Sequence, residues 1–293
     1  MQKVWTIQKV LQWTVEHFRQ KQVPEARLSA ELLLAHSLKC KRLDLYLQFD
    51  RILTPQERED FRRAVERRAK HEPVQYITGE QEFMGLSFKV SPAVLIPRPE
   101  TELLVEHVLK EISHRTNQNV NILDVGTGSG AIAISIAHQC PDCAVTAVDL
   151  SPAAIEVAME NAGTLKTENV RFEVRDILNS PDVFTVRFDL IVSNPPYVAE
   201  TERAKLQPQV TRYEPGEALF AGTEGMDFYR KFIPLLPKLL ADAGSVYLEI
   251  GYDQDWKIKK LLDKAGLSQI EFIPDYQKIN RIVKAYYEET ESR

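Results

Sequence analysis

Apolar residues in the first quarter of the chain recur at the three- and four-residue spacing of amphipathic helices. The first such stripe consists of Val4, Ile7, Leu11 and Val15. Further along, Thr54 is followed by Pro55 and then by Glu57, which is the pattern of a capped helix N-terminus. We therefore expect residues 1–75 to form a small all-helical domain.

The helix predicted over Gln56–His71 has a basic outer face. Its cationic residues are Arg58, Arg62, Arg63, Arg67, Arg68 and Lys70. Acidic residues are interspersed among them, so one interpretation is a solvated face of offsetting charge pairs. The alternative is a docking surface for an acidic or nucleic-acid partner.

Short segments of alternating polarity after the helical region predict a β-hairpin over residues 76–95, which would link two domains. The expected strand segments are Tyr76–Ile77, Glu82–Phe83 and Ser87–Val90. Prolines on both sides of Arg98 then favour an extended backbone, after which a further helix is expected.

From Val120 onward the pattern alternates between short buried strands and helices. The expected strands are Val120–Val125, Ala144–Asp149, Val170–Arg175, Phe188–Ser193, Gly244–Ile250, Gln269–Pro274 and Ile282–Tyr286. The expected helices are Ser129–His138, Pro152–Ala162, Gln254–Ala265 and a helix over Met226–Ala241 that prolines would kink. This order predicts an α/β domain over residues 96–293, with a doubly wound, mostly parallel seven-stranded sheet covered by helices on both faces. The last two strands have no helix between them and should form an antiparallel pair at one edge.

The composition is that of an ordinary globular protein, with 293 residues of which 44% are hydrophobic and 27% charged. A net charge of −5 argues against a dedicated duplex-binding protein, although it leaves room for a local basic patch. No apolar run approaches the ~20 residues of a membrane span, and the N-terminus lacks the apolar core of a secretory signal. We therefore expect no membrane association and a cytoplasmic location.

Three cysteines give no disulfide framework, which fits a reducing compartment. Cys140 and Cys143 form a CxxC pair, which we interpret as two buried or neutral thiols at a turn. A redox pair or half of a zinc site is the alternative. Tetrahedral zinc needs four ligands, and we expect no metal.

A glycine-rich turn separates the first strand of the α/β region from its helix. It contains Gly126, Thr127, Gly128, Ser129 and Gly130. The GxGxG spacing differs from the GxGxxG of dinucleotide-binding proteins. Asp124, just before the loop, can receive the ammonium of an amino-acid-like ligand but would repel a pyrophosphate. Asp149, at the end of the next strand, can accept both hydroxyls of a ribose. The set favours S-adenosylmethionine, with a purely structural turn or a nicotinamide site as alternatives.

The third strand is followed by Asp176 and Ile177. In such a fold this pair can border an adenine, with the carboxylate near the exocyclic amine and the aliphatic side chain against the ring. An ordinary aspartate at a strand end is the alternative interpretation.

Asn194-Pro195-Pro196-Tyr197 follows the fourth strand, at the sheet edge where ligands bind in doubly wound folds. The nitrogen of a planar NH2 group is a poor nucleophile because its lone pair is delocalised, and it gains positive charge as it attacks a methyl sulfonium. Two fixed acceptors on its N–H bonds would stabilise that charge. The candidates are the side-chain oxygen of Asn194 and the backbone carbonyl of Pro195. Tyr197 would add an aromatic wall, and the alternative is a rigid loop with no catalytic role.

These motifs resemble the class I S-adenosylmethionine-dependent N-methyltransferases, in which Asn-Pro-Pro-Tyr serves both adenine amino groups and glutamine amides. Other segments narrow the resemblance to the peptide chain release factor N5-glutamine methyltransferase family. They are Glu25–His36, Pro73–Gly79, Glu82–Gly85 and the distinctive Pro-Arg-Pro-Glu-Thr-Glu stretch over 97–102. The resemblance runs nearly from end to end.

The resemblance implies a bacterial cytoplasmic enzyme that methylates the glutamine of the Gly-Gly-Gln motif in class I release factors, with its helical domain holding that substrate. It implies cofactor contacts at the glycine loop, Asp149 and Asn194. The amide pocket would be lined by Asn194, Pro195, Pro196 and Tyr197. Arg98 and Glu100 would lie on a loop near the active site, as substrate-binding or ordering residues. Ile177 departs from relatives that have an aromatic residue beside the adenine.

Three other functions compete with this interpretation. An N-methyltransferase acting on exocyclic amines of nucleic-acid bases would use the same chemistry, but the chain is acidic and has no obvious DNA-binding module. A catalytically silent binding protein would not need Asp124, Asp149 and Asn194 together. A nicotinamide oxidoreductase would have a different glycine spacing and no use for the Pro-Pro loop.

Overall fold

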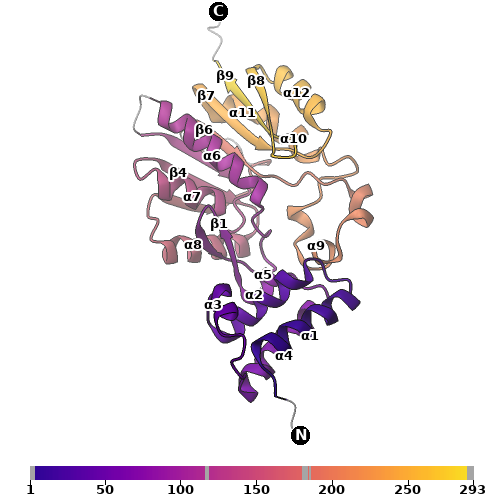
Figure 1. Ribbon diagram of the computed structural model, residues 1–293. Coiled ribbons are helices and arrows are strands. Elements are labelled where there is room, and N and C mark those ends of the chain that lie inside the picture. The colour runs from indigo at the N-terminus through magenta and orange to yellow at the C-terminus, as the bar shows by residue number, and fades with distance from the viewer. Residues whose placement is uncertain (1–3, 116–118, 180–183, 185, 289–293) are drawn as a thin grey trace, which may run out of the picture. The chain divides into compact units, whose positions relative to one another are not determined.

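The computed structural model describes residues 4–115, 119–179, 184 and 186–288. They divide into two units that are described separately below (Figure 1). The first unit comprises the chain up to Glu80 together with Gln207–Tyr213. The second comprises Gln81–Leu206 and the chain from Glu214 onward.

The first unit is helical, as its hydrophobic periodicity predicts. Its helices are α1 (Ile7–Gln20), α2 (Ala26–Leu38), α3 (Arg42–Leu47), α4 (Pro55–Arg68), α5 (Val74–Thr78) and α9 (Pro208–Tyr213). Phe18, Leu33 and Leu45 are fully buried in its core. The predicted capping box is present, since Glu57 N donates to Thr54 Oγ1 and Thr54 N donates to the Glu57 carboxylate.

Two expectations for this region are wrong. Tyr76–Ile77 lies in helix α5 and not in a strand, because Pro73 starts a helical turn and Gly79, at φ +81°, ends it. Arg68 is not on the outer face of α4 but is buried, where its guanidinium donates to Ser29 Oγ and to backbone carbonyls.

The other arginines of α4 mostly pair with carboxylates, as the charge-pair interpretation expects. Arg62 contacts Glu59 and Glu66, and Arg63 contacts Glu59. Arg67 pairs with Glu72 just beyond the helix. Such exposed pairs contribute little to stability individually.

The second unit contains the predicted seven-stranded, mostly parallel sheet, and both the number of strands and the antiparallel pair at one edge are confirmed. In spatial order the strands are β5 (Val170–Val174), β4 (Ala144–Asp149), β3 (Asn121–Val125), β6 (Phe188–Ser193), β7 (Leu240–Glu249), β9 (Asn280–Tyr287) and β8 (Leu267–Pro274). The first five are parallel, and β9 runs antiparallel to both β7 and β8. This is the doubly wound order expected of an α/β sheet with an antiparallel edge.

Helices cover both faces of this sheet because successive strand residues point to opposite sides. Leu190 and Val192 face α6 (Pro99–His114), α7 (Ala131–Gln139) and α8 (Pro152–Leu165). Ile191 faces the other side, against α10 (Asp227–Phe232), α11 (Leu236–Leu239) and α12 (Asp255–Lys264). None of the helices in the described part of the chain is long and apolar enough to cross a bilayer.

The predicted hairpin is present as β1 (Glu80–Phe83) and β2 (Leu86–Lys89). Phe83 and Phe88 pack edge to face, 6.1 Å between ring centroids, on the side of the sheet covered by α6 to α8. The single helix expected over Met226–Ala241 is wrong. Pro234 and Pro237 break it into α10, a 3₁₀ turn and α11, and β7 already begins at Leu240.

The prediction of two separate thiols at the CxxC motif is also wrong. Cys140 and Cys143 form a disulfide, which the turn between α7 and β4 permits by holding their Cα atoms 5.4 Å apart. No group of three or more His, Cys, Asp or Glu side chains among the described residues is arranged to hold a metal ion.

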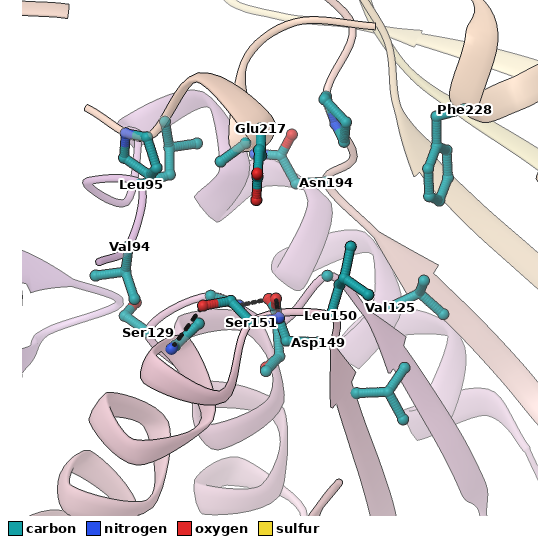
Figure 2. A pocket seen from close by; sticks show the side chains of 18 of the residues that line it. Val94, Leu95, Val125, Ser129, Asp149, Leu150, Ser151, Asn194, Glu217 and Phe228 are labelled. Carbon is teal, nitrogen blue, oxygen red and sulfur yellow. Dashed lines mark hydrogen bonds between the residues drawn. The ribbon is translucent and has the colours of Figure 1, made fainter. Parts of the chain in front are cut away.

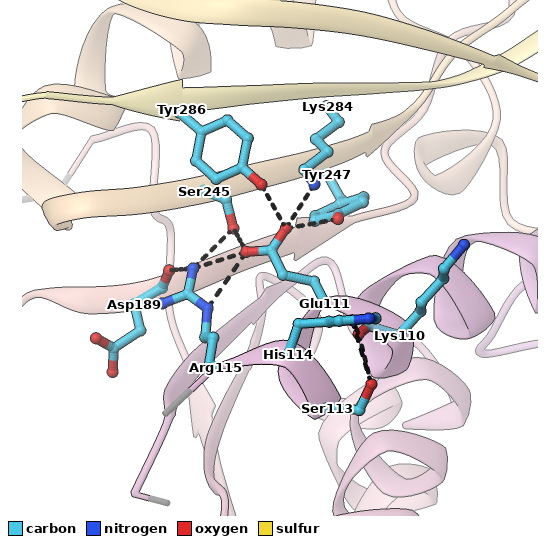
Figure 3. A network of polar contacts seen from close by, with 10 residues as sticks. All are labelled: Lys110, Glu111, Ser113, His114, Arg115, Asp189, Ser245, Tyr247, Lys284 and Tyr286. Carbon is cyan, nitrogen blue, oxygen red and sulfur yellow. Dashed lines mark hydrogen bonds and ion pairs between the residues drawn. The ribbon is translucent and has the colours of Figure 1, made fainter. Parts of the chain in front are cut away.

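A buried carboxylate ties α6 to the sheet (Figure 3). Glu111 accepts hydrogen bonds of 2.6–3.2 Å from Ser245, Tyr247, Tyr286, Arg115 and Lys284. Burial by itself would raise the pKa of Glu111, but the hydrogen bonds, with that from Lys284 foremost, lower it to about 2. The ionised carboxylate is therefore part of the folded structure.

We expect Glu111→Gln to lower the free energy of unfolding by about 3 kcal/mol at neutral pH, because it leaves two cations without their counter-charge. The folded-state pKa lies below the unfolded value of about 4.3, so this stabilisation is present above that pH. It should disappear as the pH falls toward about 2. Urea unfolding across this range measures the effect. Glu66→Gln, at an exposed position of α4, is the control, and its free energy of unfolding should change by less than about 0.5 kcal/mol. Equal effects of the two variants would show that the network around Glu111 stabilises the fold no more than an exposed ion pair does.

Candidate active site

The two chemical motifs begin side by side because β3 and β6 are neighbours. Val125 is paired with Ser193 in the parallel ladder, and Ser193 Oγ donates to the Val125 carbonyl at 2.6 Å. The glycine loop after β3 and Asn194 after β6 therefore leave the sheet at the same level. Only the strand order, which brings segments 68 residues apart together, produces this arrangement.

The glycine loop requires its glycines for two different reasons. Gly126 and Gly128 have φ of +74° and +56°, and a Cβ on either would meet nothing within 4 Å, so they face open space. Gly130 has φ +81° and a Cβ there would lie 2.7 Å from Ile134 Cδ1, so it allows close packing against the helix. The buried Asn161 donates to the Ser129 carbonyl at 2.9 Å and fixes the loop from α8.

Asp149 lies directly across the loop and is held by it. Its Oδ2 accepts from Gly128 N and its Oδ1 from Ser151 N, both at 2.9 Å. Each carboxylate oxygen keeps a second lone pair, so the group can still accept hydrogen bonds from a ligand.

These elements enclose a cavity of about 380 Å³ within the second unit. From the predicted sites, its lining includes Gly126, Thr127, Gly128, Ser129, Asp149, Asp176, Ile177, Asn194 and Pro196. Figure 2 shows Asp149 and Ser151 on one side of the cavity, with Asn194 and Glu217 on the opposite side. The volume is within the range of ~300–1,000 Å³ that small-molecule and cofactor sites occupy.

Asp176 and Ile177 are both at this cavity, but the aspartate also has a local role. Its Oδ1 accepts from Leu178 N, and its Oδ2 accepts from Asn179 Nδ2 at 2.6 Å. Ile177 is almost fully buried and packs in the core cluster beneath the cavity.

Asp124 is fully buried behind the loop and is not among the described lining residues. Its Oδ2 accepts from Thr127 Oγ1 at 2.7 Å, while Oδ1 has no hydrogen-bond partner in the described structure. Burial raises the pKa of Asp124 to about 7, although the bond from Thr127 acts in the opposite direction. A buried carboxylate oxygen without a donor is the electrostatic feature that an ammonium-bearing ligand would satisfy.

The Asn-Pro-Pro-Tyr segment is fixed by its neighbours. Asn194 Nδ2 donates to Thr101 Oγ1 at 3.0 Å, and the Tyr197 hydroxyl donates to Glu249 Oε1 at 3.1 Å. Pro195 is buried, and neither it nor Tyr197 is among the cavity-lining residues that the structure describes.

Arg98 and Glu100 are placed differently from each other. Arg98 Nη2 contacts both carboxylate oxygens of Glu214 at 2.7 Å, and Glu214 is almost completely buried. This pair ties the segment containing Pro97 to the turn after Pro215, and both prolines line the cavity. Glu100 is exposed, and neither Arg98 nor Glu100 belongs to the described lining.

Sequence reasoning missed several residues at this site. Thr101 lies inside the Pro-Arg-Pro-Glu-Thr-Glu stretch, which drew attention only to its charged residues. Glu249 ends a strand whose second half is buried throughout, and an acid in that position is a signal that could have been used. Glu217, Phe228 and Lys231 line the cavity from a segment without any recognisable motif.

Comparison with known proteins decides the family. Residues 9–79 match the PrmC N-terminal domain, and residues 116–266 match a methyltransferase domain. The release factor glutamine methyltransferase of Geobacter sulfurreducens is 42% identical over 281 residues, covering 96% of this chain and 96% of that protein. The protein of the same name from Chlorobaculum tepidum is 43% identical over 286 residues, covering 96% and 97%.

The chain belongs to the release factor glutamine methyltransferase family. The resemblance identified from the sequence motifs is therefore confirmed. The chain is also similar in fold to the solved Thermus thermophilus 16S rRNA N2 G1207 methyltransferase, with a TM-score of 0.53 and 17% identity. That match covers 71% of this chain and 49% of the other, and at this identity it shows the fold alone.

We expect Asp124→Asn to stabilise the ligand-free protein by roughly 1–3 kcal/mol at about pH 8, because asparagine keeps an acceptor for Thr127 but cannot ionise. The folded-state pKa of about 7 lies above the unfolded value near 3.9, so the wild type loses stability as the pH rises between them. Urea unfolding at about pH 5 and pH 8 should show a larger gain at the higher pH.

The exposed Asp142→Asn is the matched control for this prediction, with changes below about 0.5 kcal/mol at both pH values. A gain from Asp124→Asn that is the same at both pH values would contradict a buried, ionisable carboxyl at this position.

Proposed function

We propose that this chain transfers the methyl group of S-adenosylmethionine to the side-chain amide nitrogen (N5) of the glutamine in the Gly-Gly-Gln motif of class I release factors, leaving S-adenosylhomocysteine. The family membership supports this substrate, because relatives with that name match over nearly the full length of both chains. The observation that carries the chemistry is Asn194. It lies at the cavity with its Nδ2 bound to Thr101, and among the described residues no donor occupies its Oδ1.

The residues present fit S-adenosylmethionine. The two open glycines allow the backbone to approach a ligand, and Asp149 offers lone pairs to ribose hydroxyls. Oδ1 of Asp124, which has no donor among the described residues, would accept from an amino-acid ammonium, and that cation would favour the ionised carboxylate. Asp176 and Ile177 would border the adenine, with Ile177 contributing apolar contact where an aromatic ring is absent.

S-adenosylmethionine supplies, when bound, a methyl group on a positively charged sulfur. The contribution of the protein is to hold the amide nitrogen of the substrate with both N–H bonds engaged. Asn194 Oδ1 and the Pro195 carbonyl are the two proposed acceptors, and consecutive prolines restrict the backbone that carries them. As positive charge develops on the nitrogen, these oxygens stabilise it. No general base is required to form the bond between nitrogen and carbon, because the methylated nitrogen is cationic and strongly acidic and loses its surplus proton afterwards to water.

Different segments of the chain would have different roles in this reaction. We propose that residues 1–75 recognise the release factor, that the hairpin of β1 and β2 is the linker, and that residues 96–293 bind the cofactor and catalyse transfer. Arg98, through its ion pair with Glu214, would order the segment at the mouth of the cavity. Glu100 is exposed and available to contact the protein substrate.

The test of the proposed function offers methyl-labelled S-adenosylmethionine separately to a class I release factor, to its Gln→Ala variant in the Gly-Gly-Gln motif, and to DNA or RNA. We expect label only in the unaltered release factor. Label in nucleic acid with none in the release factor would reject the proposal in favour of methylation of base amines.

Asn194→Ala should lower kcat for release factor methylation by about 10²–10³, the effect of removing one preorganised partner of a charged transition state. The loss should exceed any change in affinity for S-adenosylhomocysteine, which calorimetry measures on the same preparation. A variant that methylates at the wild-type rate would show that this side chain is not one of the two acceptors.

Asp149→Ala should weaken S-adenosylmethionine binding by about 10–100-fold, the equivalent of losing one or two charge-assisted hydrogen bonds. Asp176→Ala should weaken it less, because that carboxylate also accepts three hydrogen bonds within its own turn. Titration calorimetry gives both constants. The reverse order would mean that Asp176, and not Asp149, is the principal polar contact.

A further inference from the structure

A buried glutamate lies behind the amide pocket, at the last position of β7. Glu249 is 2% exposed, and its two carboxylate oxygens have different partners. Oε2 accepts from Thr101 Oγ1 at 2.6 Å, and Oε1 accepts from the Tyr197 hydroxyl at 3.1 Å. One side chain therefore contacts both the helix that begins at Pro99 and the Asn-Pro-Pro-Tyr segment.

The direction of the hydrogen bonds follows from the number of protons available. A threonine hydroxyl has one proton, and at 2.6 Å from a buried carboxylate Thr101 donates it to Glu249. The hydroxyl can then only accept from Asn194, which must present its Nδ2 at 3.0 Å. An asparagine amide that presents nitrogen on one side presents oxygen on the other, so Oδ1 of Asn194 faces away from Thr101.

We propose that Thr101 and Glu249 are positioning residues that set the amide of Asn194 so that its oxygen, and not its nitrogen, is presented to the substrate. This inference rests on the proposed function, in which Asn194 Oδ1 accepts from the glutamine amide. With the opposite orientation, an NH2 group would face the NH2 group of the substrate, and neither could accept from the other.

The same carboxylate holds Tyr197, and the surroundings restrict it further. Gln254, itself buried, donates from Nε2 to the Tyr197 carbonyl at 3.0 Å. A Cβ on Gly225 would lie 2.1 Å from that carbonyl, so the backbone beside Tyr197 is closely packed. Glu249 thus connects to both ends of the Asn-Pro-Pro-Tyr segment, through Thr101 to Asn194 and directly to Tyr197.

The charged environment bears on the acceptor role of Glu249. The pKa of Glu249 is raised above its ordinary value, chiefly by burial, although the hydrogen bonds from the hydroxyls of Thr101 and Tyr197 act to lower it. The negative charge of Glu100 also raises the pKa of Glu249, whereas the positive charge of Arg281 lowers it. A glutamine at this position has only one oxygen, so it cannot accept from both hydroxyls as the carboxylate does.

The first arm of the experiment compares Thr101→Val with Thr101→Ser in the labelled release factor assay. Valine has nearly the same shape as threonine but no hydroxyl, and we expect kcat to fall about 10–100-fold, the scale of a misplaced reacting group. KM for the release factor should change less than about threefold, and serine should restore most of kcat. Failure of serine to restore it would overturn the proposal.

Tyr229→Phe is the matched control. The buried Tyr229 hydroxyl also donates at Glu249, at 2.6 Å, but to its backbone carbonyl and not to the chain that reaches Asn194. Its loss should lower the melting temperature and leave kcat within about threefold, because it removes one buried hydrogen bond without touching the carboxylate. A loss of kcat equal to that of Thr101→Val would overturn the proposal by showing that any lost bond here has that effect.

The second arm is a double-mutant cycle. A merely structural role of Thr101 would produce no coupling between Thr101 and Asn194 in this cycle. If Thr101 acts through Asn194, Thr101→Val should cost less than about threefold in an Asn194→Ala background, since the group it orients is gone. Glu249→Gln should lower kcat about 10-fold and show the same non-additivity with Asn194→Ala. If the fold-losses in kcat of the single variants simply multiply in the double variants, the proposal is overturned.

Two further measurements keep the outcomes distinct. Circular dichroism melting and S-adenosylhomocysteine calorimetry on every variant identify those that fail to fold; if Thr101→Val is among them, Glu249→Gln takes its place in the cycle. Wild-type protein that methylates no release factor rejects the proposed function itself. Wild-type protein that methylates the release factor, together with a Thr101→Val variant that keeps the wild-type kcat, rejects only the positioning role.

Discussion

Helix α6 is held along strand β7 by two buried carboxylates, one contributed by each element. Glu111 of the helix accepts from Ser245 and Tyr247 of the strand, and Glu249 of the strand accepts from Thr101 of the helix. Taking such groups out of water is unfavourable unless their donors are fixed, so the helix has one satisfactory position along the strand. The rest of the site depends on this constraint, because the first turn of α6 then meets the residue that follows β6.

Parallel strand pairing sets the level of each functional segment, and hydrogen bonds set its orientation. The ladder that joins β3 to β6 places the glycine loop and Asn194 at one edge of the sheet. Apolar packing on both faces of the sheet makes this end of the strands rigid, but it does not determine which way an amide side chain points. Orientation therefore needs directional partners, and these increase the number of polar groups buried near the cavity. Asp124 shows the consequence, since burial raises the pKa of its carboxyl to about 7 and ionisation of this group lowers the stability of the fold.

Local and periodic signals made much of the fold predictable from the sequence. The seven strands follow from alternation of apolar segments, and the glycine loop and Asn-Pro-Pro-Tyr are each a few consecutive residues. The failures occurred where a local pattern was ambiguous or the partner was distant. Two prolines divide the segment after Met226 more completely than a kink would, and Tyr76 follows a helix-starting proline in a segment that alternates like a strand. The bond between Thr101 and Glu249 spans 148 residues, so neither residue's neighbours in the sequence indicate its partner.

The buried charge of Glu249 has two ways to influence Asn194, and their magnitudes differ. Polarisation along a chain of hydrogen bonds strengthens each bond by about 10–30%, which for bonds worth about 1 kcal/mol amounts to tenths of a kcal/mol. The orientation of the amide determines whether a hydrogen bond to the substrate forms at all. A buried donor that is left unpaired costs about 1–3 kcal/mol. Geometry is therefore the larger effect. A neutral acceptor with a fixed orientation suits the proposed reaction, because it would contact the nitrogen directly while the charge that orients it remains two hydrogen bonds away.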